Sequence, residues 1–276
     1  MRTKDANFRP INMYTAPDGT LYIVDMYRGI IQEGNWVREG SYLRGVVQEY
    51  GLDRNVGRGR IYRLVHDDIA RGPRPRMLEE STAELVGHLS HGNGWWRDTA
   101  QKLIVLRGDL GVVPALRQVM KASPSALARN HAMWTLDGLS ALTSSDVLAG
   151  LGDADANVRA SAVRVSERFL VGAANESVVS GLTALADDQD VQVLLQVLRT
   201  AIYTKMSGYE ALVEGIVASH KDKDALRLTA KSYFDRIAKE KAEAARRAEI
   251  AKANAELAAA VTHGATIYKS LCFSCH

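Results

Sequence analysis

The first 66 residues carry the two-residue alternation of apolar and polar positions that is typical of β-strands. The alternation runs through 11–15 and stops at a Pro-Asp-Gly turn. After the turn, both faces of 21–26 are largely apolar, which is expected of a strand inside stacked sheets. Proline fixes its own φ and glycine tolerates a positive φ, so this pattern predicts a hairpin. A third strand is expected at 60–65 and a short helix at 42–50. These few elements cannot close a domain by themselves.

From about residue 77 to 236 the apolar positions change to helical spacing, and the pattern repeats. An Arg-x-x-Ala frame recurs near the start of four predicted helices. A fifth unit has a helix at the expected spacing but lacks both the arginine and the alanine. The anchors are Arg97, Arg129, Arg159, Gln192 and Arg227, with spacings of 32, 30, 33 and 35 residues. One helix pair per period of this length predicts an α-solenoid of the HEAT-like kind. We expect about five helix pairs.

The two residues of the frame have different expected roles. Alanine lets neighbouring repeats approach closely, while arginine near the turn can reach a carboxylate or a free carbonyl of the next unit. Asp153 and Asp155 are its candidate partners. The same spacing predicts a set of buried residues, namely Trp134, Leu136, Val163 and Leu195.

Residues 237–262 consist mainly of Ala, Glu, Lys and Arg, without Gly or Pro. These are the strongest helix formers. The apolar stripe of Ile250, Leu257 and Val261 is narrow, which favours a solvated helical spacer with one packed edge. A plain surface helix docked on the last repeat is the alternative.

The only two cysteines lie in the terminal run Leu271-Cys-Phe-Ser-Cys-His276. Cys-x-x-Cys-His is the signal for covalent attachment of a c-type haem, in which two thiols bind the porphyrin and the histidine binds its iron. The sequence therefore assigns Cys272 and Cys275 to thioether bonds with haem c, and His276 to the iron as an axial ligand. Residues 263–276 would be the start of a cytochrome c domain.

Two other chemistries of this string stay open. A structural zinc site needs about four ligands, and the chain offers only these two thiols with His276 and His263 nearby. A redox Cys-x-x-Cys pair is expected in a βαβ setting, which an alanine-rich helix does not provide.

Other candidate groups have structural interpretations. His88, His91, Trp95 and Trp96 cluster in one stretch, where turn histidines and core tryptophans are the expected roles. Asp18 and Asp25 could bind Ca²⁺, but Asp18 is already explained as a turn residue. The sequence contains no Ser/His/Asp nucleophile motif and no phosphate-binding loop.

Composition narrows the class of protein. The 276 residues are 46% hydrophobic and 24% charged, with a formal net charge of +3. This is the profile of globular domains. Because the net charge is so small, no nucleic-acid partner is expected. No segment is long and apolar enough to cross a membrane, and the first residues lack the apolar core of a signal peptide.

The motifs together resemble a known family. Phe8-Arg-Pro10, Ala16–Tyr27 and Gly59–Leu64 are similar to the closing part of the quinoprotein-glucose-dehydrogenase-like β-propeller, and Leu89–Ala100 is similar to the HEAT-like repeat that follows it. The order of propeller end (1–66), repeats (77–236), spacer (237–262) and Cys-x-x-Cys-His resembles the large planctomycete-type haem-binding dehydrogenase-like proteins. The expected fold class is thus mainly α, with an N-terminal β segment from the last propeller blade and a C-terminal helix leading into a truncated cytochrome c domain.

That resemblance implies a periplasmic or other extracytoplasmic redox protein whose parent oxidises a sugar or an alcohol and passes electrons to a redox partner protein. The chain reads as a fragment of such a parent. The propeller blades in which pyrroloquinoline quinone (PQQ), Ca²⁺ and a catalytic base would lie are missing, as is the distal haem ligand. No catalytic residue is assigned, and only Cys272, Cys275 and His276 are carried over from the family.

Two hypotheses follow. In the first, the chain transfers electrons through haem c, and the repeats tether the haem to a dehydrogenase-like propeller. In the second, the α-solenoid is a protein-binding scaffold without redox activity.

Overall fold

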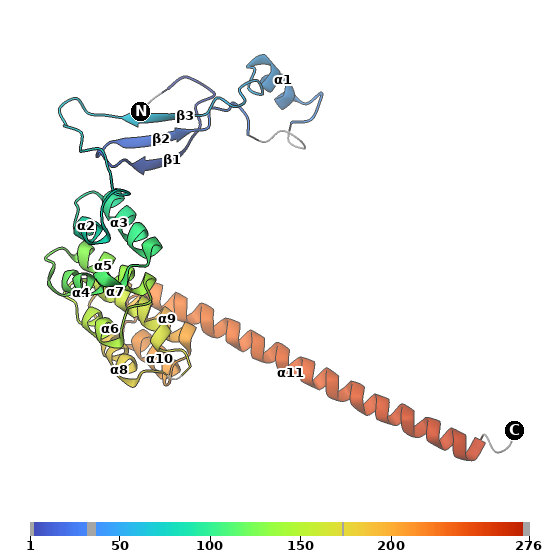
Figure 1. Cartoon of the computed structure of the whole chain (residues 1–276). Helices are drawn as coiled ribbons and strands as arrows, with labels where there is room; N and C mark the ends of the chain where they lie inside the picture. Colours follow the sequence, from blue (N-terminus) through green and yellow to red (C-terminus); the bar gives the residue numbers. More distant parts are fainter. Residues whose placement is uncertain (1–2, 32–36, 173, 273–276) are drawn as a thin grey trace. The chain divides into compact units, whose positions relative to one another are not determined.

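The computed structural model describes residues 3–31, 37–172 and 174–272 (Figure 1). The chain is mainly helical, with an N-terminal three-stranded antiparallel sheet and a long C-terminal helix. The expected mainly α class with an N-terminal β segment and a C-terminal helix is therefore confirmed. It divides into two units, Met1–Asp146 and Val147–His276.

The sheet follows the predicted hairpin. Strand β1 (Pro10–Thr15) pairs with β2 (Leu21–Asp25), and β2 pairs with β3 (Arg60–Leu64). In the turn, Gly19 adopts a φ of 83°, which explains the glycine there. The pairing of β3 with β2 confirms the predicted third strand. The predicted short helix is also present, as α1 (Tyr42–Glu49).

The sheet is less buried than its apolar composition suggests. All six residues of β1 are exposed, and in β2 only Ile23 and Asp25 are buried. The expectation that β2 lies inside stacked sheets therefore fails for the described residues. The small core of this segment contains Ala16, Ile23, Val37 and Val47.

The helical repeats begin in the first unit. Helix α2 (Thr82–His88) packs against α3 (Gly94–Arg107), α4 (Val113–Ala122) packs against α5 (Ala126–Gly138), and α3 packs against α5. Side chains cap the first turns of α2, α3 and α5, from Ser81, Asn93 and Ser125 respectively, which satisfies N–H groups that a helix leaves free.

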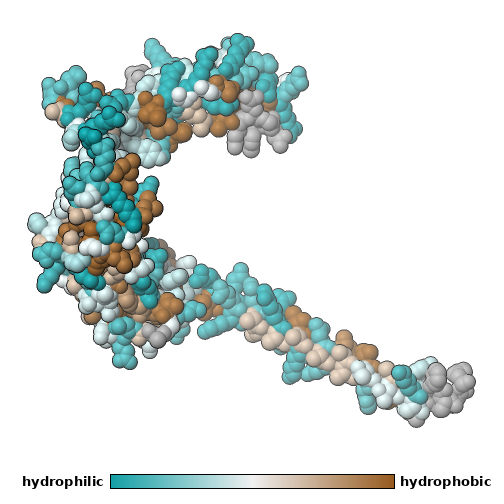
Figure 2. Space-filling view, viewed as in Figure 1, coloured by the Kyte–Doolittle hydropathy of each residue, from teal (hydrophilic) through white to brown (hydrophobic). Residues whose placement is uncertain are grey.

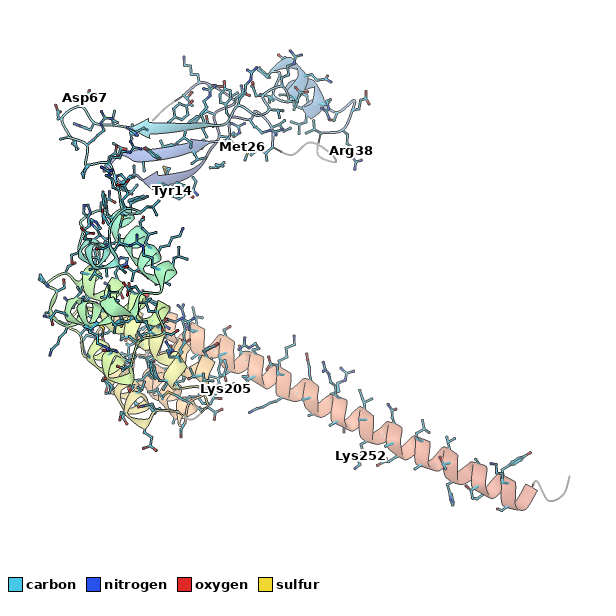
Figure 3. All side chains as sticks on the ribbon, in the orientation of Figure 1. Tyr14, Met26, Arg38, Asp67, Lys205 and Lys252 are labelled. Carbon is cyan, nitrogen blue, oxygen red and sulfur yellow. The ribbon has the colours of Figure 1, made fainter. Side chains whose placement is uncertain are left out.

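The second unit continues the same construction. After α6 (Ser144–Leu151), which crosses the division, its helices are α7 (Ala156–Val165), α8 (Glu176–Thr183), α9 (Val191–Thr204), α10 (Tyr209–Ser219) and α11 (Asp224–Ile267). Helix α9 packs against α7, α10 and α11. Lys205 ends α9 in the left-handed conformation, with a φ of 50° (Figure 3).

The Arg-x-x-Ala register predicts the core correctly. The four alanines of the frame are between 0% and 4% exposed; they are Ala100, Ala132, Ala162 and Ala230. Leu136, Val163 and Leu195 are buried as expected, but Trp134 is only half-buried. That one prediction is wrong because the Trp134 ring lines a surface groove between α3 and α5.

We expect Ala162→Phe to lower the free energy of unfolding by about 1 to 3 kcal/mol, because Ala162 is fully buried in α7 and a larger side chain overpacks the contact. Chemical denaturation measures this change. Asn157→Phe on the exposed side of the same helix is the matched control and is expected to change stability by less than about 0.5 kcal/mol. Equal stability of the Ala162→Phe and control proteins would contradict the register.

Candidate functional site

The predicted haem-binding string follows the last helix. Helix α11 ends at Ile267, and one π turn, Tyr268–Cys272, continues from it. Cys272 is thus placed at the end of a helix, whereas Cys275 and His276 lie outside the described residues. Their assignment to haem c stays a prediction.

Helix α11 is one continuous element of 44 residues. The expected boundaries at 236/237 and 262/263 therefore correspond to no break in the helix. Its buried residues are Leu226, Ala230 and Tyr233, all in the first three turns. Every residue from 238 to 270 is exposed, and Figure 3 shows side chains such as Lys252 projecting from it.

This exposure decides between two expectations for the spacer. The solvated character is confirmed, whereas the packed edge is absent from residues 238–262, so docking on the last repeat is also wrong for that stretch. At 1.5 Å per residue the helix spans about 66 Å. About 58 Å of helix separates the last buried residue, Tyr233, from Cys272.

The repeat arginines close the turns between helices. Each of three donates from Nη1 to the carbonyl oxygen six residues earlier, at 2.7 to 2.9 Å. The pairs are Arg97 with His91, Arg129 with Ser123 and Arg159 with Asp153. The expected role near a free carbonyl is confirmed, although the carbonyl belongs to the arginine's own turn.

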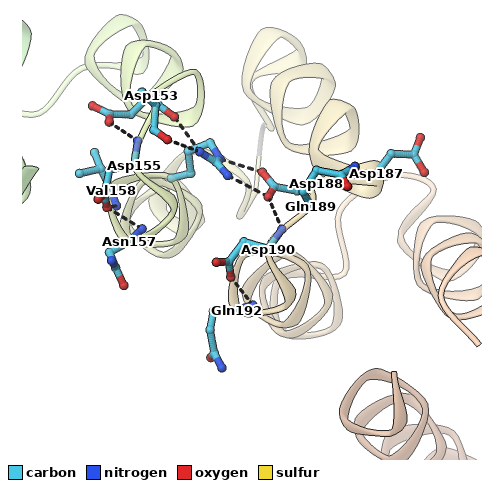
Figure 4. A network of polar contacts seen from close by, with 11 residues as sticks. Asp153, Asp155, Asn157, Val158, Asp187, Asp188, Gln189, Asp190 and Gln192 are labelled. Atoms are coloured by element: carbon cyan, nitrogen blue, oxygen red, sulfur yellow. Dashed lines mark hydrogen bonds and ion pairs between the residues drawn. The ribbon is translucent and has the colours of Figure 1, made fainter. Parts of the chain in front are cut away.

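Arg159 also reaches the corresponding turn of the next repeat (Figure 4). Its Nε and Nη2 donate to the two carboxylate oxygens of Asp188 at 2.7 and 2.9 Å. The side chains of Arg159 and Asp188 are 17% and 5% exposed. The bidentate pair therefore connects the turn before α7 with the turn before α9.

The candidate partners Asp153 and Asp155 have other roles. Asp153 meets Arg159 through its backbone carbonyl, and its carboxylate accepts from the N–H of Asp155. Asp155 is the N-cap of α7 and accepts from the N–H groups of Asn157 and Val158. Asp153 is therefore a partner of Arg159 as predicted, through its carbonyl oxygen. The bidentate carboxylate is that of Asp188, which was not predicted, and Asp155 caps its own helix, as an aspartate directly before a helix commonly does.

The histidines and tryptophans at the start of α3 form one structural cluster. The indole of Trp96 is 5% exposed and donates from Nε1 to the carbonyl of Pro17 at 2.8 Å. The rings of His88 and His91 lie 5.0 and 5.1 Å from the Trp96 ring. The side chain of Asn93 donates to the carbonyl of Ala16 at 2.8 Å. The cluster thus joins the β-hairpin turn to the first repeat.

The two aspartates weighed for calcium serve the backbone. Asp18 accepts from the N–H and the hydroxyl of Thr20, which fixes the hairpin turn. Asp25 is 1% exposed, and its Oδ1 accepts from the N–H groups of Arg9 and Tyr27. Among the described residues, no group of three or more His, Cys, Asp or Glu side chains could hold a metal ion.

A groove that the sequence did not predict lies between α3 and α5. It has a volume of about 510 Å³ and is lined by Leu106, Trp134 and Asp137 among others. Gly138 allows the close approach of the two helices, since a Cβ there would lie 2.7 Å from Cγ2 of Val105. The signal in the sequence that could have indicated this groove is Trp134, a large aromatic residue two positions after the buried frame alanine Ala132.

His131 lies beside this groove. Its Nδ1 is 2.7 Å from Oε1 of Gln101, which lines the groove. Burial lowers the pKa of His131 below its ordinary value of 6.5 and outweighs the opposite effect of the Asp98 carboxylate. Burial therefore favours the neutral form of this imidazole.

No helix within the described part of the chain has the length and apolar character that crossing a membrane requires.

Comparison with known proteins covers only the N-terminal segment. No curated protein matches the sequence. Residues 1–68, which contain the three-stranded sheet and α1, match a family model described as a domain of unknown function, DUF7133.

Proposed function

We propose that this protein transfers electrons through a c-type haem that is bound covalently by Cys272 and Cys275, with His276 as an axial ligand of the iron. The repeats and α11 tether this group to a dehydrogenase-like propeller, of which residues 1–66 are the closing part. The observation that carries the proposal is the Cys-x-x-Cys-His string directly after a long exposed helix.

The donor set fits haem better than it fits the two other chemistries. Two thiols three residues apart, followed at once by an imidazole, supply both thioether bonds and one iron ligand. A zinc site would need about one more ligand, and the one other histidine nearby, His263, lies nine residues before Cys272 on the same exposed helix. The continuous helix α11 is also unlike the βαβ setting of redox Cys-x-x-Cys pairs.

The chain's own residues would present the group to a partner. Haem c, when bound, would supply a one-electron carrier. The exposed stretch extends from residue 238 of α11 to residue 270 of the π turn, so its end is accessible to a redox partner protein without displacement of the repeats. Attachment of haem c and the family resemblance both favour a periplasmic or other extracytoplasmic location.

Expression with an added export signal, in a bacterial host with cytochrome c maturation, tests the proposal. We expect a covalent haem band on a denaturing gel and a c-type absorbance spectrum. Cys272→Ser with Cys275→Ser should abolish both, and His276→Ala should reduce attachment, because these residues form the bonds. Ser274→Ala lies between the thiols, forms none of these bonds and is the matched control that should keep full haem content.

A second function is favoured by the groove between α3 and α5. Its half-buried Trp134 and the 71% exposed Leu106 give an apolar surface of the kind that helical repeats use to bind protein segments. In this alternative the chain is a scaffold without redox activity. Wild-type protein that is folded and haem-free after the expression test above would favour it.

A further inference from the structure

The outer half of α11 carries an uncharged stripe. At 100° per residue, the large side chains Ile250, Leu257, Val261 and Tyr268 lie within about 20° of a single line along the helix. They are 52%, 65%, 64% and 59% exposed. Figure 2 shows apolar, beige and brown atoms along this part of the chain.

The charges of the same stretch are segregated from the stripe. Between residues 250 and 268 the titratable side chains are Lys252, Glu256 and His263, and at helical spacing all three lie on the opposite half of the helix. This stretch lies within residues 238–270, all of which are exposed. Its apolar face, about 27 Å long, is therefore not covered by the rest of the described chain.

We infer that a second copy of this chain covers the stripe, with the two α11 helices antiparallel and centred near residue 259. This register places Ile250 against the partner's Tyr268 and Leu257 against the partner's Val261. Gly264 lets the helix axes approach closely. The spacing of the stripe residues is the same in both directions along the helix. The stripe of one chain therefore matches the reversed stripe of a second chain, as a two-fold symmetric contact requires.

Charge complementarity selects the antiparallel orientation. Before Ile250, the residues on the line of the stripe are charged, and they include Glu243 and Arg246. In a parallel pair each would meet its own copy, and like charges would repel. In the antiparallel pair, Arg246 and Arg247 lie beside the partner's helix C-terminus, where the helix dipole favours cations.

The balance of charge supports the same occupant. Helices that lie on membranes carry many Lys and Arg on their polar face, whereas here Lys252 is offset by Glu256. The contact is shorter than three heptads, so the dimer should be weak and depend on concentration.

Light scattering and sedimentation equilibrium of the full chain under reducing conditions test the inference. The mass should rise from 30.2 kDa toward twice that value with increasing concentration. Leu257→Glu with Val261→Glu should abolish the rise, and because both side chains are exposed, the fold should be unaffected. Ala255→Glu with Ala259→Glu, on the opposite face, is the matched control and should dimerise normally.

Orientation has its own readout. In a Cys272→Ser and Cys275→Ser background, spin labels at Ala245→Cys should lie about 42 Å apart along the axis of an antiparallel dimer and side by side in a parallel one. A wild-type monomer at every concentration would overturn the inference, as would a stripe variant that dimerises like the wild type. A monomer that sediments with acidic phospholipid vesicles would assign the stripe to a membrane instead.

Discussion

Asp188→Ala should lower the free energy of unfolding by about 3 kcal/mol, because it leaves the guanidinium of Arg159 without its carboxylate partner. Both side chains of this pair are largely withdrawn from water, and the pair connects the turns before α7 and α9. Urea or thermal denaturation at neutral pH measures the loss. Asp187→Ala is the matched control, because Asp187 is exposed and points away from Asp188 in Figure 4.

The same pair should make stability depend on pH in acid. Burial acts to raise the pKa of the Asp188 carboxyl, but hydrogen bonds from Arg159 and from the N–H of Asp190 outweigh it and hold the pKa below the ordinary 3.8. A lowered pKa means that the stabilisation is complete above pH 3.8 and is lost as the pH falls through the lower, folded-state value. The difference between wild type and Asp188→Ala should therefore shrink in acid. A difference that stays constant into strong acid would contradict this account of the pair.

Trp96→Ala should cost about 3 to 5 kcal/mol, since it removes a large buried side chain and leaves a cavity. It also removes the hydrogen bond from Nε1 to the Pro17 carbonyl and the ring contacts with His88 and His91. Trp96→Phe keeps most of the volume and loses the hydrogen bond, so about 1 kcal/mol of its cost should come from that bond.

The tryptophan prediction has a local readout as well. The N–H groups of Ala16 and Gly19 close the hairpin turn through bonds to Thr20 and Ala16. If Trp96 joins this turn to the first repeat, hydrogen exchange at both amides should accelerate in Trp96→Ala. Unchanged protection of the turn, together with a loss of global stability, would limit Trp96 to packing within the repeat.

The elements that the sequence predicts well are those with a local cause. The Pro-Asp-Gly turn determines the hairpin, because few residue combinations tolerate that backbone. The Arg-x-x-Ala frame identifies the repeats, because an alanine at the closest contact between helices cannot be replaced by a larger residue without a cost, and all four frame alanines are buried.

The failures have a common cause, which is competition that only tertiary structure resolves. Asp155 and Asp188 are equally near a turn in the sequence, yet the first caps its own helix and only the second is free to bind Arg159. Trp134 has core spacing, but it lies at a groove rather than in a closed layer. The boundaries of the spacer were drawn from composition, whereas a helix without an interior proline simply continues from Asp224 to Ile267.

The candidate site was found from residue chemistry alone. The spacing of two thiols and an imidazole is a local signal. The prediction for Cys272, Cys275 and His276 therefore did not depend on knowledge of the fold. What the fold adds is the setting of Cys272, at the end of a helix that is exposed along its last 33 residues before Leu271.

Intact mass spectrometry of the denatured, acid-extracted protein from a maturation-competent host tests the central claim most directly. Non-covalent haem is removed by this treatment, whereas thioether-bound haem is retained. The account predicts wild-type chain heavier by one haem, with the added mass on the peptide that contains Cys272 and Cys275. Exported, folded wild-type chain with only the mass of its amino acids would contradict it.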